Sequence, residues 1–199
     1  MIEFIDVVSD PPYLDFKDLY QRAIDNEQNA IEAFAISSYD LNENEVESRF
    51  VNLKYIQQNQ WIFFSNYLSP KAKQFQSHNQ ISAVVFWDSI NVQIRIKGII
   101  SKTTDEISNM HFEKRSLEKN ALAISSKQSD PIQSFEEVSK NFQITFDSIS
   151  SSTTRPDYWG GFAFIPYYFE FWEGQENRLN ERYVYYLQNN SWIETILQP

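Results

Sequence analysis

Apolar and polar residues alternate along several segments of the chain. Residues 91–102 (NVQIRIKGIISK) alternate from Val92 to Lys97, the period that is typical of a half-buried strand. Alternation, or a short apolar run between turn residues, predicts further strands at 30–40, 48–56, 61–68, 81–89, 161–174, 182–188 and 191–198. Pro166 is expected to break or bulge the longest of these strands. Consecutive strands separated by short polar turns indicate an antiparallel meander.

Helical spacing predicts helices around these strands. Apolar residues from Phe16 to Ile24 follow Asp15, a suitable N-cap, so a helix is expected from Asp15 to about Asn29. Ser69 can cap a second helix. Further helices are expected at 105–114, 116–129 and 134–146. The segment before the first helix, residues 1–14, is expected to be irregular and flexible, because its two adjacent prolines disrupt regular pairing.

Together these segments predict a mainly β (α+β) protein with six to eight antiparallel strands and three to five helices packed around them. A barrel is the expected closure, because it removes the free edges of the sheet. The 199 residues fit one domain, 1–199, that is long enough to bury a core.

Composition narrows the classes of function. The chain has no cysteine and two histidines, which excludes cysteine-ligated zinc and disfavours a multi-histidine metal site. A net charge of -10 argues against nucleic acid as a partner. No apolar run reaches the ~20 residues of a membrane span, and the N-terminus lacks a basic signal-peptide region. We therefore expect a soluble, cytoplasmic protein that binds no membrane. Its 16 Phe, 11 Tyr and 5 Trp indicate an aromatic core or a dimer interface.

Several polar residues point to an anionic ligand. Lys71 falls in the first turn of a predicted helix, where a cation is unfavourable unless an anion lies beside it; the alternative is a solvated lysine. Arg49 and Lys54 lie on one predicted strand, five residues apart. Strict alternation places them on opposite faces of the strand. A bulge could bring both to one face, or they could reach a ligand from two directions. The alternative is that both are simply exposed.

Other polar residues are candidates for ligand contacts. Gln93 lies among apolar residues and needs a hydrogen-bond partner. The hydroxyls of SSKQSD, residues 125–130, suit a phosphate or a helix cap. Trp172 can cover a planar ligand, and Arg178 and Arg182 can bind anionic oxygens, with Glu173 and Glu181 expected to orient these cations. Exposed salt bridges are the alternative. The sequence has no dinucleotide-binding glycine motif, P-loop or G-x-S-x-G motif.

Taken in order, these segments resemble the pyridoxamine 5'-phosphate oxidase family, flavoenzymes that use FMN and dioxygen to make pyridoxal 5'-phosphate. The resemblance extends from about Tyr13 to Pro199. The segments that carry it are SRFVNLK (48–54), FFSNYLSPKA (63–72), VQIRIKG (92–98), SSKQSD (125–130), YWGGF (158–162) and EFWEGQENRLNER (170–182).

The resemblance implies a split β-barrel and a homodimer with FMN at the interface. Arg49 and Lys71 would hold the FMN phosphate, and Lys54 would lie beside the flavin on the substrate side. The other residues that the resemblance assigns to FMN are Phe64, Ser65, Gln128 and Ser129, and, across the dimer interface, Gln93, Trp172 and Arg182.

The resemblance also implies a substrate site, in which this chain departs from the family pattern. Lys54 and Arg115 match the residues that grip the substrate phosphate, and Arg178 and Lys54 carry the catalytic roles. His111 stands at a tyrosine position, Lys119 at a serine position, Asn180 at a histidine position and Pro70 at an arginine position.

Three functions follow as alternatives. The first is an FMN-dependent oxidase of pyridoxamine or pyridoxine 5'-phosphate, with dioxygen as the second substrate and hydrogen peroxide as a product. The second is an FMN oxidase of the same fold acting on another small anionic substrate, as in phenazine pathways. The third is a binder of FMN or pyridoxal phosphate that catalyses nothing.

Overall fold

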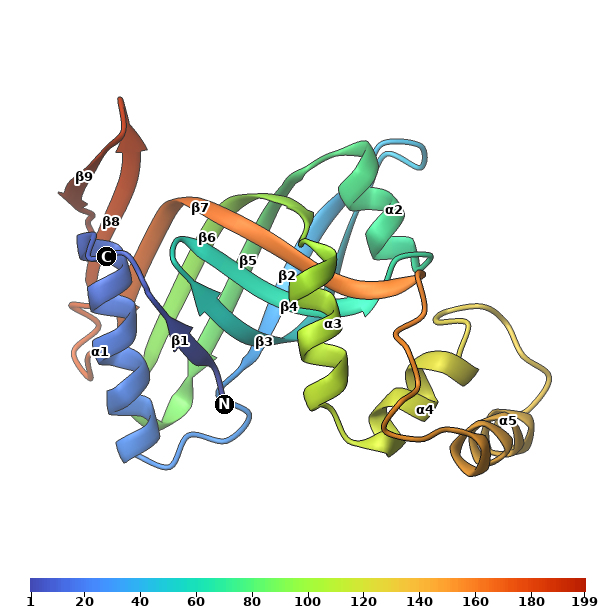
Figure 1. The fold of residues 1–199 in the computed structure, drawn as a ribbon. Coiled ribbons are helices and arrows are strands. Elements are labelled where there is room, and N and C mark those ends of the chain that lie inside the picture. The colour runs from blue at the N-terminus through green and yellow to red at the C-terminus, as the bar shows by residue number, and fades with distance from the viewer.

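Six strands close into a barrel in the computed structural model, which describes residues 1–199 (Figure 1). They are β2 (Ala33–Asp40), β3 (Glu45–Gln57), β4 (Gln60–Asn66), β5 (Gln80–Trp87), β6 (Val92–Lys102) and β7 (Trp159–Glu173). The order β3-β2-β5-β6-β7 is closed because β4 pairs with both β3 and β7. All of these pairings are antiparallel, so the expected barrel is confirmed.

Three more strands extend the sheet. The last strands, β8 (Glu181–Gln188) and β9 (Ser191–Ile196), form a hairpin that continues from the distal half of β7. Asn189 and Asn190 both have positive φ at its turn, as a two-residue hairpin turn requires. The short β1 (Glu3–Ile5) pairs in parallel with β3.

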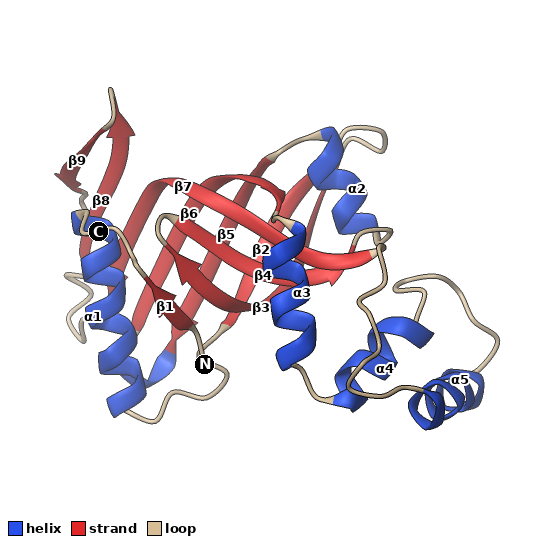
Figure 2. Ribbon diagram, viewed as in Figure 1, coloured by secondary structure: helices blue, strands red, loops and turns tan.

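Five helices flank the barrel (Figure 2). Helix α1 (Pro11–Asp25) covers one end, and α3 (Asp105–Lys114) crosses the outside of the barrel near its other end. Helix α2 (Pro70–Ser77) follows β4, and the 3-10 turn η1 (Asp88–Ile90) joins β5 to β6. Helices α4 (Leu117–Ser125) and α5 (Phe135–Ser148) form a separate lobe beside α3. No helix combines the length and the apolar character that crossing a membrane requires.

Two expectations about the N-terminal segment are wrong. Residues 1–14 are not irregular throughout, because β1 pairs with β3 and α1 begins at Pro11 rather than at Asp15. Pro11 and Pro12 occupy the first helical positions, where a missing N–H costs nothing and the fixed φ suits the helix. The residue before the helix is therefore Asp10, and Asp15 lies inside it.

Two bulges set which side chains face outward. The β6–β7 register shifts between Lys97 and Gly98, opposite Pro166, where a bulge or break was expected. A second shift leaves Lys54 of β3 without a partner on β4. Because of this extra residue, Leu53 and Ile56 both face the main core although they are three residues apart.

The aromatic residues mostly build the core. A cluster of 28 buried residues fills the barrel and the space under α1. Phe16 of α1 lies 4.4 Å from Trp61 of β4 between ring centres, and it also contacts Phe34 and Trp87. The helix thereby closes one end of the barrel.

Candidate functional site

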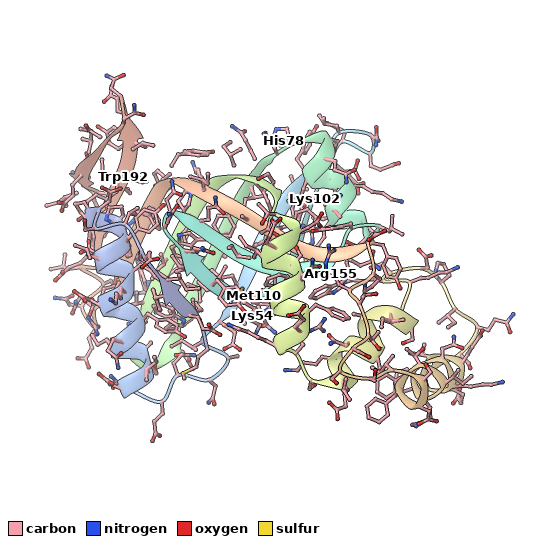
Figure 3. The ribbon with its side chains drawn as sticks, viewed as in Figure 1. Lys54, His78, Lys102, Met110, Arg155 and Trp192 are labelled. Carbon is pink, nitrogen blue, oxygen red and sulfur yellow. The ribbon has the colours of Figure 1, made fainter.

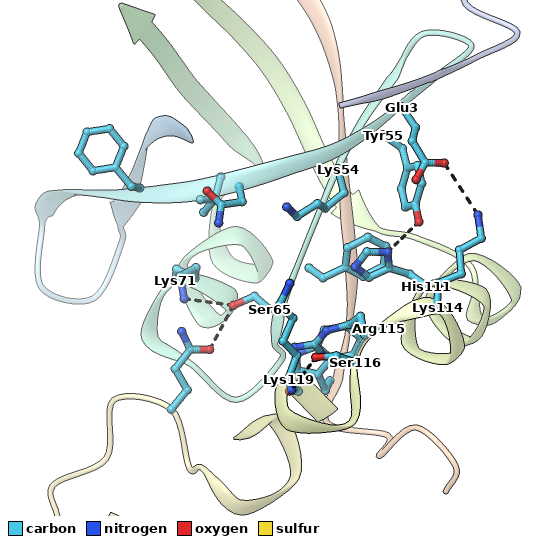
Figure 4. A pocket seen from close by; sticks show the side chains of 16 residues that line it. Glu3, Lys54, Tyr55, Ser65, Lys71, His111, Lys114, Arg115, Ser116 and Lys119 are labelled. Carbon is cyan, nitrogen blue, oxygen red and sulfur yellow. Dashed lines mark hydrogen bonds and ion pairs between the residues drawn. The ribbon is translucent and has the colours of Figure 1, made fainter. Parts of the chain in front are cut away.

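A cavity of about 500 Å³ lies outside the barrel, between β3, β4, α3 and α4 (Figure 4). It gathers eight of the residues that the sequence singled out: Lys54, Phe64, Ser65, Lys71, His111, Arg115, Lys119 and Gln128. Five of its lining side chains are cationic, whereas Glu3 is the only acidic one. In a protein of net charge -10, such a concentration of positive charge indicates an anionic ligand.

One corner of the cavity has the donors that a phosphate needs. Lys71, in the first turn of α2, donates a hydrogen bond of 3.1 Å to the hydroxyl of Ser65 at the end of β4. Ser65 in turn donates to Oε1 of Gln128 at 3.3 Å. Burial, and then the charge of Arg49, lower the pKa of Lys71. A bound anion would compensate Lys71 both for its burial and for its repulsion by Arg49. This corner therefore fits a phosphate group.

Arg115 forms the second cationic corner together with Lys54 and Lys119. It ends α3, its guanidinium lies 4.3 Å above the ring centre of Trp159, and its Nη2 donates to the carbonyl of Lys119 at 2.9 Å. Nη1 of Arg115 is buried and has no hydrogen-bond partner. Burial lowers the pKa of Arg115 to about 10, which leaves it charged at neutral pH. An unpaired buried donor is costly, and a bound anion would satisfy it.

An aromatic wall separates the two corners from the barrel. His111 of α3 stacks on Phe64 of β4 with ring centres 3.8 Å apart and planes 11° apart, and Phe64 also stacks on Trp159. Nδ1 of His111 lies 2.7 Å from the hydroxyl of Tyr55. Burial, and then the charges of Arg115 and Lys54, lower the pKa of His111 to about 3. His111 is therefore neutral across the physiological range.

Two adjacent glycines let α3 approach β7 at this wall. A side chain at Gly160 would collide with the hydroxyl of Tyr67, and one at Gly161 with Thr103 just before α3. The main chain of β7 can therefore lie against the start of α3. This close approach explains the two glycines that follow Trp159.

Two other residues assigned to the phosphate lie outside the cavity. Arg49 is next to it: its guanidinium donates to Ser38 at 2.6 Å and to Gln74 at 2.9 Å. Ser129 has a positive φ and lines a separate hollow between α4 and α5. The bulge considered for β3 is present, but it leaves Arg49 and Lys54 in different surroundings.

Gln93, Trp172 and Arg182 form a second group. They are direct cross-strand neighbours on β6, β7 and β8. Arg178 and Asn180 lie in the β7–β8 loop, where Oδ1 of Asn180 accepts from the main-chain N–H of Gln175. The hairpin of β8 and β9 lies at the opposite end of the molecule from helices α4 and α5 (Figure 1). Trp192 of this hairpin lies well apart from Lys54 (Figure 3). Within one chain, Gln93, Trp172 and Arg182 therefore do not line the cavity.

Glu170 orients Arg182, and the sequence did not single it out. Its carboxylate is 3% exposed and accepts hydrogen bonds of 2.8 Å from both Arg182 and Arg95. The expectation that Glu173 orients these cations is wrong, because Glu173 pairs with Arg22 of α1 at 2.7 Å. Glu181 makes no ion pair at all.

Comparisons with known proteins decide the family. The chain is 32% identical over 191 residues to the pyridoxine/pyridoxamine 5'-phosphate oxidase of Legionella pneumophila (strain Paris), covering 94% of this chain and 87% of the relative. It is also 32% identical to the enzyme of the same name from Coxiella burnetii, covering 98% of each chain. This chain belongs to the pyridoxine/pyridoxamine 5'-phosphate oxidase family. A model of the pyridoxine 5'-phosphate oxidase C-terminal dimerisation region matches residues 159–199.

Solved structures confirm the split-barrel fold of this family member. The structure of PhzG from Burkholderia lata, in complex with tetrahydrophenazine-1-carboxylic acid, superposes with a TM-score of 0.89 at 23% identity, covering 98% of this chain and 99% of PhzG. A pyridoxamine 5'-phosphate oxidase-related, FMN-binding protein from Nostoc punctiforme superposes with a TM-score of 0.77 at 13% identity, covering 96% of this chain and 99% of that one.

Three residues of the site were missed in the sequence. Trp159 was noted only as part of a motif, although a tryptophan beside two glycines is a sign of a close packing contact. Tyr55 reaches the cavity only because of the bulge at Lys54. Glu170 is a carboxylate between Phe169 and Phe171, both buried, and a charge in such a strand needs a partner.

Proposed function

We propose that this protein is an FMN-dependent oxidase that works as a homodimer and oxidises pyridoxamine or pyridoxine 5'-phosphate. One observation carries the proposal: a single cavity, backed by an aromatic wall, holds two cationic corners, one around Lys71 and one around Arg115. Two corners suit two phosphorylated compounds, the cofactor and the substrate.

The residues present fit the phosphate of FMN. Lys71, Ser65 and Gln128 supply a cation, a hydroxyl and an amide within hydrogen-bond reach of one another. Arg49 adds a charge close enough to lower the pKa of Lys71. Ser129 would take part only if the loop after α4 closed toward this corner.

The outer face of the sheet supports a dimer. Phe50 lines the rim of the cavity and is 75% exposed. Its row of cross-strand neighbours runs through Ala35, Val84 and Arg95 to Glu170, which holds Arg182. A second copy on this face would cover the small and apolar side chains. It would also bring Gln93, Trp172 and Arg182 of the partner subunit toward the cavity, as the match to a dimerisation region favours.

The second corner would hold the substrate phosphate. Lys54, Arg115 and Lys119 supply the charge, and the unpaired Nη1 of Arg115 supplies a buried donor. Arg178 and Asn180 of the partner subunit would contact the rest of the substrate, and Lys54 would lie beside the flavin on the substrate side. Asn180 can donate and accept hydrogen bonds there, but it cannot exchange a proton near neutral pH.

Bound FMN would supply the two-electron acceptor that takes hydride from the substrate and passes the electrons to dioxygen, with release of hydrogen peroxide. This chain's residues would bind, orient and shield. The Phe64–His111–Trp159 wall keeps water from one side of the cavity. Arg182 is held by Glu170, and in the dimer it would place a fixed positive charge beside the flavin.

A second candidate function is an FMN oxidase that acts on a carboxylated tricyclic substrate. The observation that favours it is the local chemistry of the substrate corner: His111, Lys119 and Asn180 replace the tyrosine, serine and histidine of the family pattern. PhzG, which was solved with tetrahydrophenazine-1-carboxylic acid, has the same fold.

Peroxide release from the FMN-loaded protein separates these functions. Rapid turnover of pyridoxamine 5'-phosphate, and none of unphosphorylated pyridoxamine, supports the proposal. Turnover confined to a carboxylated, reduced tricycle supports the second candidate. A flavin-loaded protein that oxidises neither compound would be a binder rather than an oxidase, and the proposal would fail.

A further inference from the structure

The bulge in β3 brings Tyr55 to His111. Because Lys54 has no partner on β4, Tyr55 faces the small cluster under α3 instead of the barrel core. Its ring meets the imidazole edge-on at 5.3 Å between centres, and its hydroxyl lies 2.7 Å from Nδ1. Figure 4 shows Tyr55 and His111 turned toward each other at the side of the cavity away from Lys71. The stack on Phe64 holds the imidazole plane from one side.

We propose that Tyr55 is a positioning residue: by donating to Nδ1, it fixes His111 as a neutral imidazole whose Nε2–H donates to an anionic group of the substrate. The inference rests on the proposed function in that the second cationic corner is taken to be the substrate's. It adds a specific hydrogen-bond donor to that corner. It also explains how a neutral histidine can bind an anion at a position that cations already surround.

The direction of the hydrogen bond follows from the available donors and acceptors. The hydroxyl of Tyr55 has one proton and makes no hydrogen bond other than the one with His111. If Nδ1 carried the imidazole proton, the proton of this nearly buried phenol would have no acceptor within the protein. With Tyr55 as the donor, both groups are satisfied, and the single proton of the neutral imidazole lies on Nε2.

The charges around His111 favour the same arrangement. The groups that face it come from four elements: Glu3 of β1, Lys54 of β3, Lys114 and Arg115 of α3, and Lys119 of α4. Burial is the main cause of the lowered pKa of His111, and the four cations, opposed by one carboxylate, disfavour an imidazolium further. Burial and the nearby Glu3 raise the pKa of Tyr55, which keeps the phenol protonated.

The arrangement has a consequence for binding. An anion in this corner would receive a directional N–H donor whose protonation does not change between pH 6 and 8, in addition to the charges of Lys54, Arg115 and Lys119. Loss of such a hydrogen bond costs about 1 kcal/mol, which is about fivefold in affinity. Tyr55→Phe should therefore weaken anion binding even though Tyr55 itself does not touch the anion.

The tautomer can be measured directly in the FMN-loaded protein. The chain has two histidines, so a spectrum with ¹⁵N-labelled histidine holds two imidazoles, and His78→Gln assigns them. We expect a proton on Nε2 and an acceptor-type shift at Nδ1 in His111. Adding inorganic phosphate, whose binding at the flavin corner FMN blocks, should shift the Nε2 resonance. A proton on Nδ1, or a Nε2 resonance that phosphate does not move, would overturn the inference.

A double-mutant cycle gives the second readout. His111→Gln keeps a donor near the Nε2 position without needing Tyr55. We expect Tyr55→Phe to weaken phosphate binding about fivefold in the wild-type background and to change it little in the His111→Gln background. FMN affinity serves as the control for folding in all three variants. Equal losses in both backgrounds would refute the coupling. Neither experiment uses turnover, so a failure here is distinct from a protein that does not oxidise pyridoxamine 5'-phosphate.

Discussion

Glu170 and Arg182 lie on adjacent strands, and the Glu170 carboxylate accepts a hydrogen bond of 2.8 Å from the Arg182 guanidinium. Its other oxygen accepts from Arg95 and from the hydroxyl of Tyr168. Burial alone would raise the pKa of Glu170, but these donors outweigh it and lower the pKa. The carboxylate thus holds two arginines in place on the sheet face that we assign to the dimer interface.

Glu170→Gln should destabilise the protein and weaken FMN binding. The change leaves Arg95 and Arg182 side by side without their shared carboxylate. Their side chains are 44% and 27% exposed, so we expect a loss of about 1–3 kcal/mol in the free energy of unfolding, less than for a fully buried pair. Urea unfolding measures it. Glu181→Gln, on the neighbouring strand and without an ion pair, is the matched control, and equal losses in the two variants would contradict the role of Glu170.

Lys71→Met should weaken the binding of FMN but not of riboflavin. A lost charge-assisted hydrogen bond to phosphate costs about 1.5–3 kcal/mol, which is about 10- to 100-fold in affinity. Riboflavin lacks the phosphate, so its affinity should stay unchanged. Lys73→Met removes an exposed cation from the same helix and is the control. Quenching of flavin fluorescence measures all four affinities, and a parallel loss for both flavins would show that Lys71 does not bind the phosphate.

Two variants that each bind FMN poorly should restore binding in mixed dimers if each site is built from both chains. Lys71→Met damages the cavity, and Arg182→Gln damages the contribution of the partner subunit while it keeps a donor for Glu170. In randomly mixed dimers, about a quarter of the sites would have an intact cavity and an intact partner. Flavin bound per chain and peroxide release should recover in that proportion. No recovery after mixing, with dimer exchange shown by mass, would place both residues in one chain's site.

Acid should destabilise the wild type more than His111→Gln. An unfolded histidine has a pKa near 6.5, whereas burial and neighbouring cations lower that of His111 to about 3 in the fold. Between these values the unfolded chain binds a proton that the folded chain does not, so stability falls as the pH falls from about 6.5 toward 3. The difference in Tm between pH 7 and pH 5 should be smaller in the variant. Equal differences would mean that His111 is readily protonated in the fold.

The strands could be predicted from the sequence because each has one face in the core. Alternation in residues 91–102 describes β6 well, since Val92, Ile94 and Ile96 are all buried. The three residues of β1 are too few for a periodic pattern, and their pairing with β3 joins segments about fifty residues apart. Two adjacent prolines such as Pro11 and Pro12 predict a break in regular structure, although the same fixed φ favours a helix start.

Residues of the candidate site could be predicted from the sequence where a residue type is unusual for its local position. Lys71 in a helix's first turn is unusual by itself, and the structure puts it in the cavity. Tyr55 and Glu170 were not predictable in this way, because their roles depend on neighbours. Tyr55 meets His111 through a bulge that no local pattern encodes, and Glu170 meets Arg95 across a strand register that spans 75 residues of sequence.

The ratio of bound flavin to chains reports dimerisation and cofactor binding together. Native mass spectrometry of the purified protein, incubated with FMN and then freed of excess flavin, reports both in one measurement. We expect a dimer that carries two FMN. A monomer that retains no flavin would contradict it.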